Sequence, residues 1–147
     1  MQAAPPPASA RPAHLGWRLL AMIYDSLPLA ALWLLVSALA LLLHAGVPIA
    51  PWSLLFWLQV LALWTISGGY LVMSWQRGGQ TLGMRPWRLR LYRCDGQPLT
   101  ARRLWGRYAL ATLSLASGIG LLWALLDRRR RCLHDIGANT QVLRFDR

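Results

Sequence analysis

The sequence contains no lysine and no glutamate, so sixteen arginines and five aspartates carry its formal charge, a net +11. Charged residues make up 14% of the 147 positions and hydrophobic residues 56%. A soluble domain typically has about 25% charged and ~45–50% apolar residues. The shortage of charge excludes an intrinsically disordered protein, and the excess of Leu, Ala and Trp argues against a soluble enzyme.

Motifs of catalytic sites are also missing. The segment GGQTLG, residues 78–83, lacks the Lys-Ser/Thr ending with which a Walker-type loop holds phosphate. The sequence has no GxSxG, HExxH or paired-carboxylate pattern. We therefore expect no enzymatic activity and no cofactor.

Cysteine and histidine are scarce and scattered, and no CxxC occurs, so we expect no metal site. The two cysteines, Cys94 and Cys132, fall in segments that we expect to face a reducing cytoplasm, which argues against a disulfide. His134 precedes Asp135, but one such neighbouring pair is weak evidence of acid–base chemistry. We expect His134 to lie at the surface.

Charge is wholly absent from the 51 residues between Ser26 and Gln76. Two membrane spans need about 20 apolar residues each and a turn between them. The sequence therefore predicts a helical hairpin with spans at about residues 19–43 and 49–75. Pro28 and the pair Gly68–Gly69 indicate kinks or points of close helix packing.

Arginines flank this hairpin on one side only. Arg11 and Arg18 precede the first span, five arginines lie between residues 77 and 93, and the connecting turn has none. Cytoplasmic flanks carry the arginine excess, so we expect a cytoplasmic N-terminus. The Ala/Pro-rich residues 1–13 should form a disordered tail before a single membrane domain, residues 14–147.

A third apolar helical segment, residues 101–126, is interrupted near Gly118–Gly120 and has arginines at both ends. A single crossing would place Arg128–Arg131 outside the cell, against the distribution of charge seen in membrane proteins. The segment is therefore either a re-entrant or interfacial hairpin, which we favour, or a third span. The fold class is an all-α membrane protein. Residues 88–92 and 140–145 read as strands that could pair into a small cytoplasmic ribbon.

Three charged residues have a distinctive placement: Arg18 and Asp25 in GWRLLAMIYDSLPL, and Asp135 in RRRRCLHDIGANTQVL. Together with the Gly-Gln-Thr-x-Gly motif at residues 79–83, this pattern resembles the RDD family of small bacterial membrane proteins. The resemblance implies a multi-pass protein of the bacterial inner membrane. That family is generally described as of unknown function, with transport suspected.

The residues leave two interpretations open for each of these side chains. An aspartate inside a span is a proton or cation site, or it is a structural partner for an arginine. Arg18 is a headgroup anchor, or it pairs with Asp135. Asp135 is a solvated counter-charge to Arg128–Arg131, or it folds back against the mouth of the hairpin.

Two functions follow from these interpretations. The first is transport of a small ion or solute with Asp25 as the proton or cation site. Two or three helices cannot enclose a pathway, so this hypothesis requires a homo-oligomer or a partner membrane protein. The second is a non-transporting accessory or scaffold protein whose Arg/Asp network is structural. In both cases we expect the arginines to contact anionic lipid headgroups rather than nucleic acid.

Overall fold

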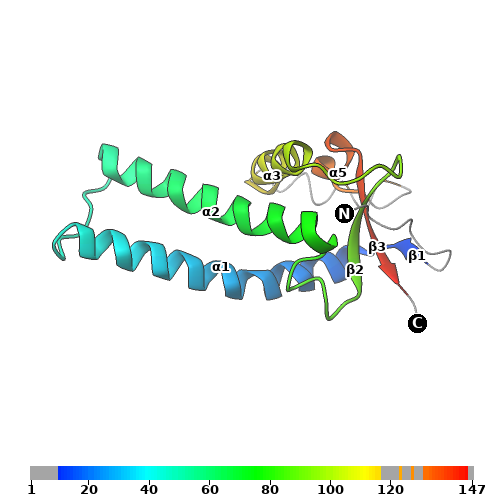
Figure 1. Ribbon diagram of the computed structural model, residues 1–147, viewed down its shortest axis with the longest axis horizontal. Helices are drawn as coiled ribbons and strands as arrows, with labels where there is room; N and C mark the ends of the chain where they lie inside the picture. Colours follow the sequence, from blue (N-terminus) through cyan, green and yellow to red (C-terminus); the bar gives the residue numbers. More distant parts are fainter. Residues whose placement is uncertain (1–9, 117–122, 124–126, 128–130, 146–147) are drawn as a thin grey trace.

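The computed structural model describes residues 10–116, 123, 127 and 131–145. Two long helices, α1 (Leu15–Leu43) and α2 (Leu54–Gly78), lie side by side as a hairpin, with a small sheet at one end (Figure 1). Ser53 caps the start of α2, where its hydroxyl accepts a hydrogen bond from the Phe56 N–H at 3.2 Å. Gly79 ends α2 in a left-handed conformation with φ +68°.

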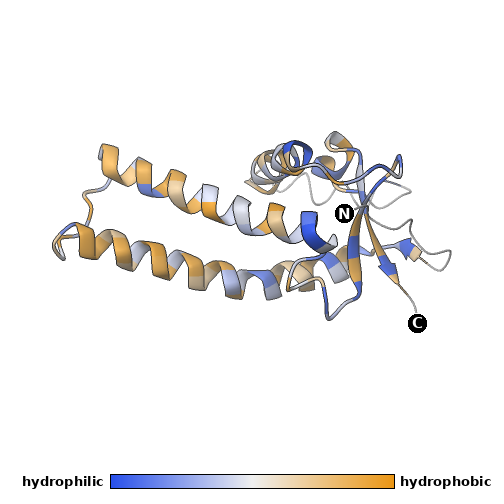
Figure 2. Ribbon diagram, viewed as in Figure 1, coloured by the Kyte–Doolittle hydropathy of each residue, from blue (hydrophilic) through white to orange (hydrophobic). Residues whose placement is uncertain are grey.

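Both hairpin helices are long and apolar enough to cross a membrane. They agree with the two predicted spans, and α1 continues through Pro28. Figure 2 shows that the parts of α1 and α2 far from the sheet are the most hydrophobic. Large side chains there are open to the surroundings: Leu34 is 72% exposed and Leu43 80%. Such a surface suits lipid rather than water.

The sheet has three antiparallel strands in the order β1–β3–β2: β1 (Ala10–Pro12), β2 (Leu89–Arg93) and β3 (Thr140–Phe145). The predicted pairing of β2 with β3 is confirmed, with Leu91 opposite Val142. Because the structure contains this three-stranded sheet, the fold is mostly helical rather than all-α.

The prediction that residues 1–13 are disordered was wrong for the last part of this segment. Ala10–Pro12 form β1, and Ala10 lies opposite Phe145 on β3. Proline is tolerated at this position because an edge strand needs backbone hydrogen bonds on one side only. Residues 1–9 of that tail lie outside the described residues.

A third helix, α3 (Ala101–Ala116), packs across α2 near the sheet, and the short α5 (Leu133–Gly137) lies beside it (Figure 1). A Cβ on Gly68 would lie 2.4 Å from the Trp105 ring, so the glycine lets α3 approach. The predicted close packing at Gly68 is confirmed. The break expected near Gly118–Gly120 lies outside the described residues.

The buried core sits where the start of α1, the end of α2, α3 and the sheet meet. Leu89, Leu91 and Leu104 are almost fully buried there, with Val72 and Val142 against them. This core holds the first two turns of α1 against the end of α2 and the sheet, and the charged side chains lie at its edge.

Candidate functional site

Arg18 and Asp25 lie on one face of α1, as their spacing of two helical turns predicts. Ala21 lies between them on the same face, and all three residues are buried. In a helix whose other faces are largely exposed, this stripe marks the side that contacts the rest of the protein. Arg18 and Asp25 nevertheless contact different partners.

Arg18 forms an ion pair with Asp135, which is 117 positions away in the chain. A second guanidinium, that of Arg107 on α3, binds the other carboxylate oxygen of Asp135 at 2.5 Å. Asp135 is 0% exposed and Arg18 6%. The interpretations of Asp135 as a solvated counter-charge and of Arg18 as a headgroup anchor were therefore wrong: α5 carries Asp135 back against the mouth of the hairpin.

Two arginines and one aspartate give this buried cluster a net positive charge. Burial by itself raises the pKa of Asp135, but Arg107 and Arg18 outweigh it and hold that pKa well below its ordinary value. Arg107 also stacks over Trp75, with its guanidinium carbon 4.4 Å from the ring centroid. Nε and Nη2 of Arg18 are buried and have no hydrogen-bond partner within the described residues.

His134 and Cys132 belong to the same cluster, so the expected surface position of His134 was wrong. The His134 ring is buried, with Nδ1 3.4 Å from the Ser114 hydroxyl oxygen. Burial and the charge of Arg107 lower the pKa of His134 to about 4, so the ring is neutral at physiological pH. Burial raises the pKa of the Cys132 thiol, which accepts a hydrogen bond from Arg18 at 3.3 Å.

Cys132, His134 and Asp135 offer ligand atoms within 4.8 Å of one another, a spacing that suits a metal ion. Both Asp135 oxygens, however, accept hydrogen bonds from guanidinium groups. A cation here would have to displace two arginines and bear their repulsion. The charges therefore argue against a metal centre.

Asp25 is held by the loop that follows α2. One carboxylate oxygen accepts a hydrogen bond from the Thr81 hydroxyl, and the other accepts from the Gly83 N–H at 2.9 Å and the Tyr70 hydroxyl at 3.1 Å. The ion pairs found in the described part of the chain do not include Asp25. Among the described residues, hydroxyl and N–H groups rather than an arginine hold Asp25.

Gly83 explains how the loop comes so close to α1. A Cβ at this position would lie 2.2 Å from the Ala21 carbonyl oxygen and 2.8 Å from the Asp25 carboxyl carbon. Any side chain would push the loop away and break the hydrogen bond to Asp25. Part of the Gly-Gln-Thr-x-Gly motif thus serves to deliver one hydroxyl and one N–H to this carboxylate.

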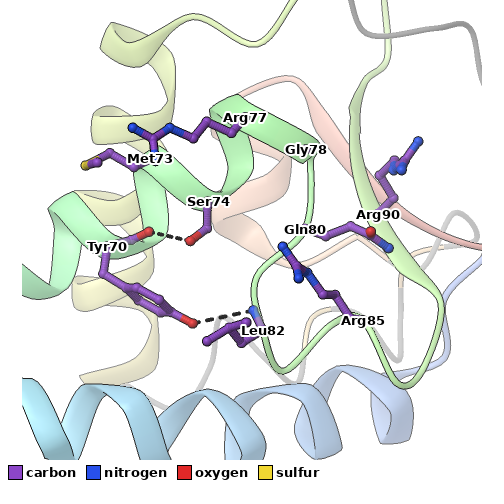
Figure 3. A pocket seen from close by; sticks show the side chains of 9 residues that line it. All are labelled: Tyr70, Met73, Ser74, Arg77, Gly78, Gln80, Leu82, Arg85 and Arg90. Carbon is purple, nitrogen blue, oxygen red and sulfur yellow. Dashed lines mark hydrogen bonds between the residues drawn. The ribbon is translucent and has the colours of Figure 1, made fainter.

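Tyr70 connects Asp25 to a pocket beside the end of α2. The pocket has a volume of about 420 Å³, and the residues that line it come from α2, from the loop and from β2 (Figure 3): Tyr70, Met73, Ser74, Arg77, Gly78, Gln80, Leu82, Arg85 and Arg90. The Tyr70 hydroxyl points toward the loop at Leu82. Asp25 is thus one hydrogen bond away from a side chain that lines this pocket.

Sequence reasoning missed Arg107 and Tyr70. A signal for Arg107 existed, because it shares the buried face of α3 with Leu104, Ala111 and Ser114 at helical spacing. An arginine on such a face requires a buried acid. Tyr70 gives no comparable signal, since tyrosine is common near the ends of membrane spans.

No curated protein and no solved structure matches this chain. The model of the RDD family matches residues 12–139 and so includes Arg18, Asp25, Arg107 and Asp135. The chain therefore belongs to the RDD family, and with its two apolar helices it is a membrane-type protein of that family.

Proposed function

We propose that this protein transports a small ion or solute across the bacterial inner membrane and that Asp25 is its proton-binding residue. One observation carries the proposal: Tyr70 both donates a hydrogen bond to the buried Asp25 and lines the pocket at the end of α2. An acid inside an apolar span is a functional site by default. A hydroxyl between that acid and a pocket gives a proton a path to it.

The partners of Asp25 suit a group that gains and loses a proton. A hydroxyl both donates and accepts, so Thr81 and Tyr70 can donate to the carboxylate and accept from the carboxylic acid. Only the Gly83 N–H is restricted to donating. Asp25 can therefore change its protonation state while it keeps hydrogen bonds to both side chains.

The charge around the pocket favours a proton over a metal cation. Arg77, Arg85 and Arg90 line the pocket, and no aspartate lies among its lining residues. A metal cation would have to pass these positive side chains, whereas a proton can move along hydroxyl groups and water. The transported species is then an ion or solute whose movement is coupled to the proton on Asp25.

Two apolar helices do not enclose a pathway, so transport requires a homo-oligomer or a second membrane protein. The large exposed side chains along α1 and α2 supply surface for such an assembly and for lipid. The arginine distribution supports a cytoplasmic position for the N-terminus and for the pocket.

The test is proton flux in vesicles that contain the purified full-length protein and an internal pH-sensitive dye. Imposed gradients of K⁺, Na⁺ and Cl⁻ serve as probes. We expect Asp25→Asn to abolish coupled flux, and Tyr70→Phe, which removes one hydroxyl, to slow it by about tenfold or more. Asp95→Asn is the matched control because Asp95 is exposed on a turn. Wild-type flux in the Asp25→Asn protein would rule out the proposal.

A second candidate is a non-transporting accessory or scaffold protein. The observation in its favour is the bridge from Arg18 on α1 through Asp135 to Arg107 on α3, which joins three parts of the chain. This candidate predicts no flux in the wild type under any gradient. It also predicts that Asp25→Asn changes folding or capture of a partner rather than transport.

A further inference from the structure

The pocket beside the end of α2 contains two guanidinium groups that have no counter-charge among the residues that the structure describes. Arg85 extends from the loop toward α2, and Arg77 lies on α2 beside Met73 (Figure 3). Both side chains are exposed. Neither makes an ion pair or a side-chain hydrogen bond within the described residues. The third arginine, Arg90, places its guanidinium carbon over the Phe145 ring at 5.7 Å.

The aspartates in the described part of the chain have other partners. Asp95, Asp127 and Asp135 pair with arginines other than these two. Asp25 binds hydroxyl and N–H groups. The four aspartates that the structure describes therefore leave Arg77 and Arg85 free to bind an anion from outside the chain.

The rest of the pocket indicates what kind of anion fits. Met73 is 49% exposed and Leu82 51%, so an apolar surface adjoins the two charges. The pocket also lies at the end of an apolar helix long enough to span a membrane, where phospholipid headgroups meet the protein. Guanidinium groups bind phosphate oxygens in pairs of parallel hydrogen bonds.

We propose that this pocket binds a phosphate group through Arg77 and Arg85. An anionic phospholipid headgroup and free inorganic phosphate are the two sources of that chemistry. The exposed Met73 and Leu82 favour the lipid, whose glycerol and first methylenes would cover them. This site goes beyond the proposed transport, because it needs neither Asp25 nor proton movement.

The test measures binding of phosphatidylglycerol, phosphatidylcholine and inorganic phosphate to the full-length protein in detergent, by quenching of tryptophan fluorescence. The Arg77→Gln/Arg85→Gln variant should bind phosphatidylglycerol about 30-fold more weakly, the effect of two arginines near a headgroup. The control is Arg102→Gln/Arg103→Gln, which removes the same charge from exposed positions on α3. It should change binding less than about threefold.

The results with the different probes distinguish a phospholipid headgroup from free inorganic phosphate. Saturable binding of phosphatidylglycerol, with no binding of inorganic phosphate, identifies a lipid site. If inorganic phosphate binds and the Arg77→Gln/Arg85→Gln variant weakens its binding as much as that of phosphatidylglycerol, the ligand is a soluble anion. Equal loss in both double variants would overturn the proposal, because it would mean attraction by net charge alone. Absence of saturable binding of either probe would also overturn it.

A second measurement is independent of the folding of the variants. Phosphatidylglycerol with a photoreactive headgroup is cross-linked to the wild-type protein, and the modified peptides are identified by mass spectrometry. We expect cross-links within residues 70–90. Cross-links confined to other parts of the chain would overturn the proposal. Neither binding measurement depends on proton flux through Asp25. The phosphate site and the proposed transport function can therefore be disproved independently of each other.

Discussion

The Arg18 guanidinium and the Asp135 carboxylate form a buried ion pair between the first helical turn of the membrane hairpin and the C-terminal segment. Arg107 completes the contact from α3. Neighbouring charges of one sign cannot be buried together without a counter-charge, so Asp135 holds two arginines in place. Arg18 and Asp135, both within the residues that the family model matches, thus form one structural unit in this chain.

Removal of the Asp135 charge should strongly destabilise the protein. Asp135→Asn leaves two buried guanidinium groups unpaired, and loss of one partner from a buried ion pair costs about 3–5 kcal/mol. The free energy of unfolding, measured by denaturant titration in detergent, should fall by this amount. Asp95→Asn, on an exposed turn, should change it by less than about 1 kcal/mol. Equal effects of the two substitutions would contradict the buried pair.

A second substitution should partly restore the stability. The Arg18→Met/Asp135→Leu protein loses the acid together with one of its arginines, so fewer unpaired charges stay buried. We expect its free energy of unfolding to exceed the value expected from adding the two single effects. Simple additivity would mean that the two side chains do not act on each other.

Stability should rise with pH between about 4 and 6.5 because of His134. Its pKa is lowered to about 4 in the folded protein, below the ordinary value of 6.5. In this window the unfolded chain binds a proton that the folded protein does not, so stability falls as pH falls. The loss amounts to about 3 kcal/mol. Asp135, whose pKa is also lowered, adds a further loss below its ordinary value of 3.8.

The measurement is the free energy of unfolding at a series of pH values from 4 to 8 for wild type and His134→Gln. We expect the slope between about 4 and 6.5 to flatten in the variant. His14→Gln, at an exposed position, is the control and should retain the slope. If the free energy of unfolding of His134→Gln still rises steeply with pH in this window, another titratable group causes the pH dependence.

Gly83→Ala should destabilise the loop that holds Asp25. The new Cβ would lie 2.2 Å from the Ala21 carbonyl oxygen, a distance that forces the loop away from α1. We expect a loss of about 1–3 kcal/mol, the usual cost of overpacking. Gly69→Ala is the matched control because a Cβ there meets nothing within 4 Å. A Gly83→Ala protein as stable as Gly69→Ala would show that the loop does not press on α1.

The two ends of the chain should lie on the same side of the membrane. Strands β1 and β3 pair through Ala10–Phe145 and Pro12–Leu143, and backbone hydrogen bonds of this kind cannot form across a bilayer. We expect reporters fused before Met1 and after Arg147 to report the same compartment, the cytoplasm by the arginine distribution. Reporters on opposite sides would mean three crossings and would exclude the sheet.

Much of the fold could be read from composition and local pattern. The charge-free run that begins at Ser26 predicts the hairpin, because a long apolar segment without charge is stable only in lipid or in a core. Alternation of side chains predicts β2 and β3. The face shared by Arg18 and Asp25 follows from helical spacing alone. These features are local, so neighbouring residues determine them.

The partners of those residues depended on the tertiary structure. A sequence does not tell which acid meets which arginine when sixteen arginines are present. In the structure, Arg18 and Arg107 pair with Asp135, whereas Asp25 accepts hydrogen bonds from a threonine, a tyrosine and a backbone N–H. Composition alone also misplaced Ala10–Pro12, because an edge strand is stabilised by its neighbour rather than by its own residues. Long-range contacts between α1, the loop after α2, α3 and α5 make these choices, and no local pattern encodes them.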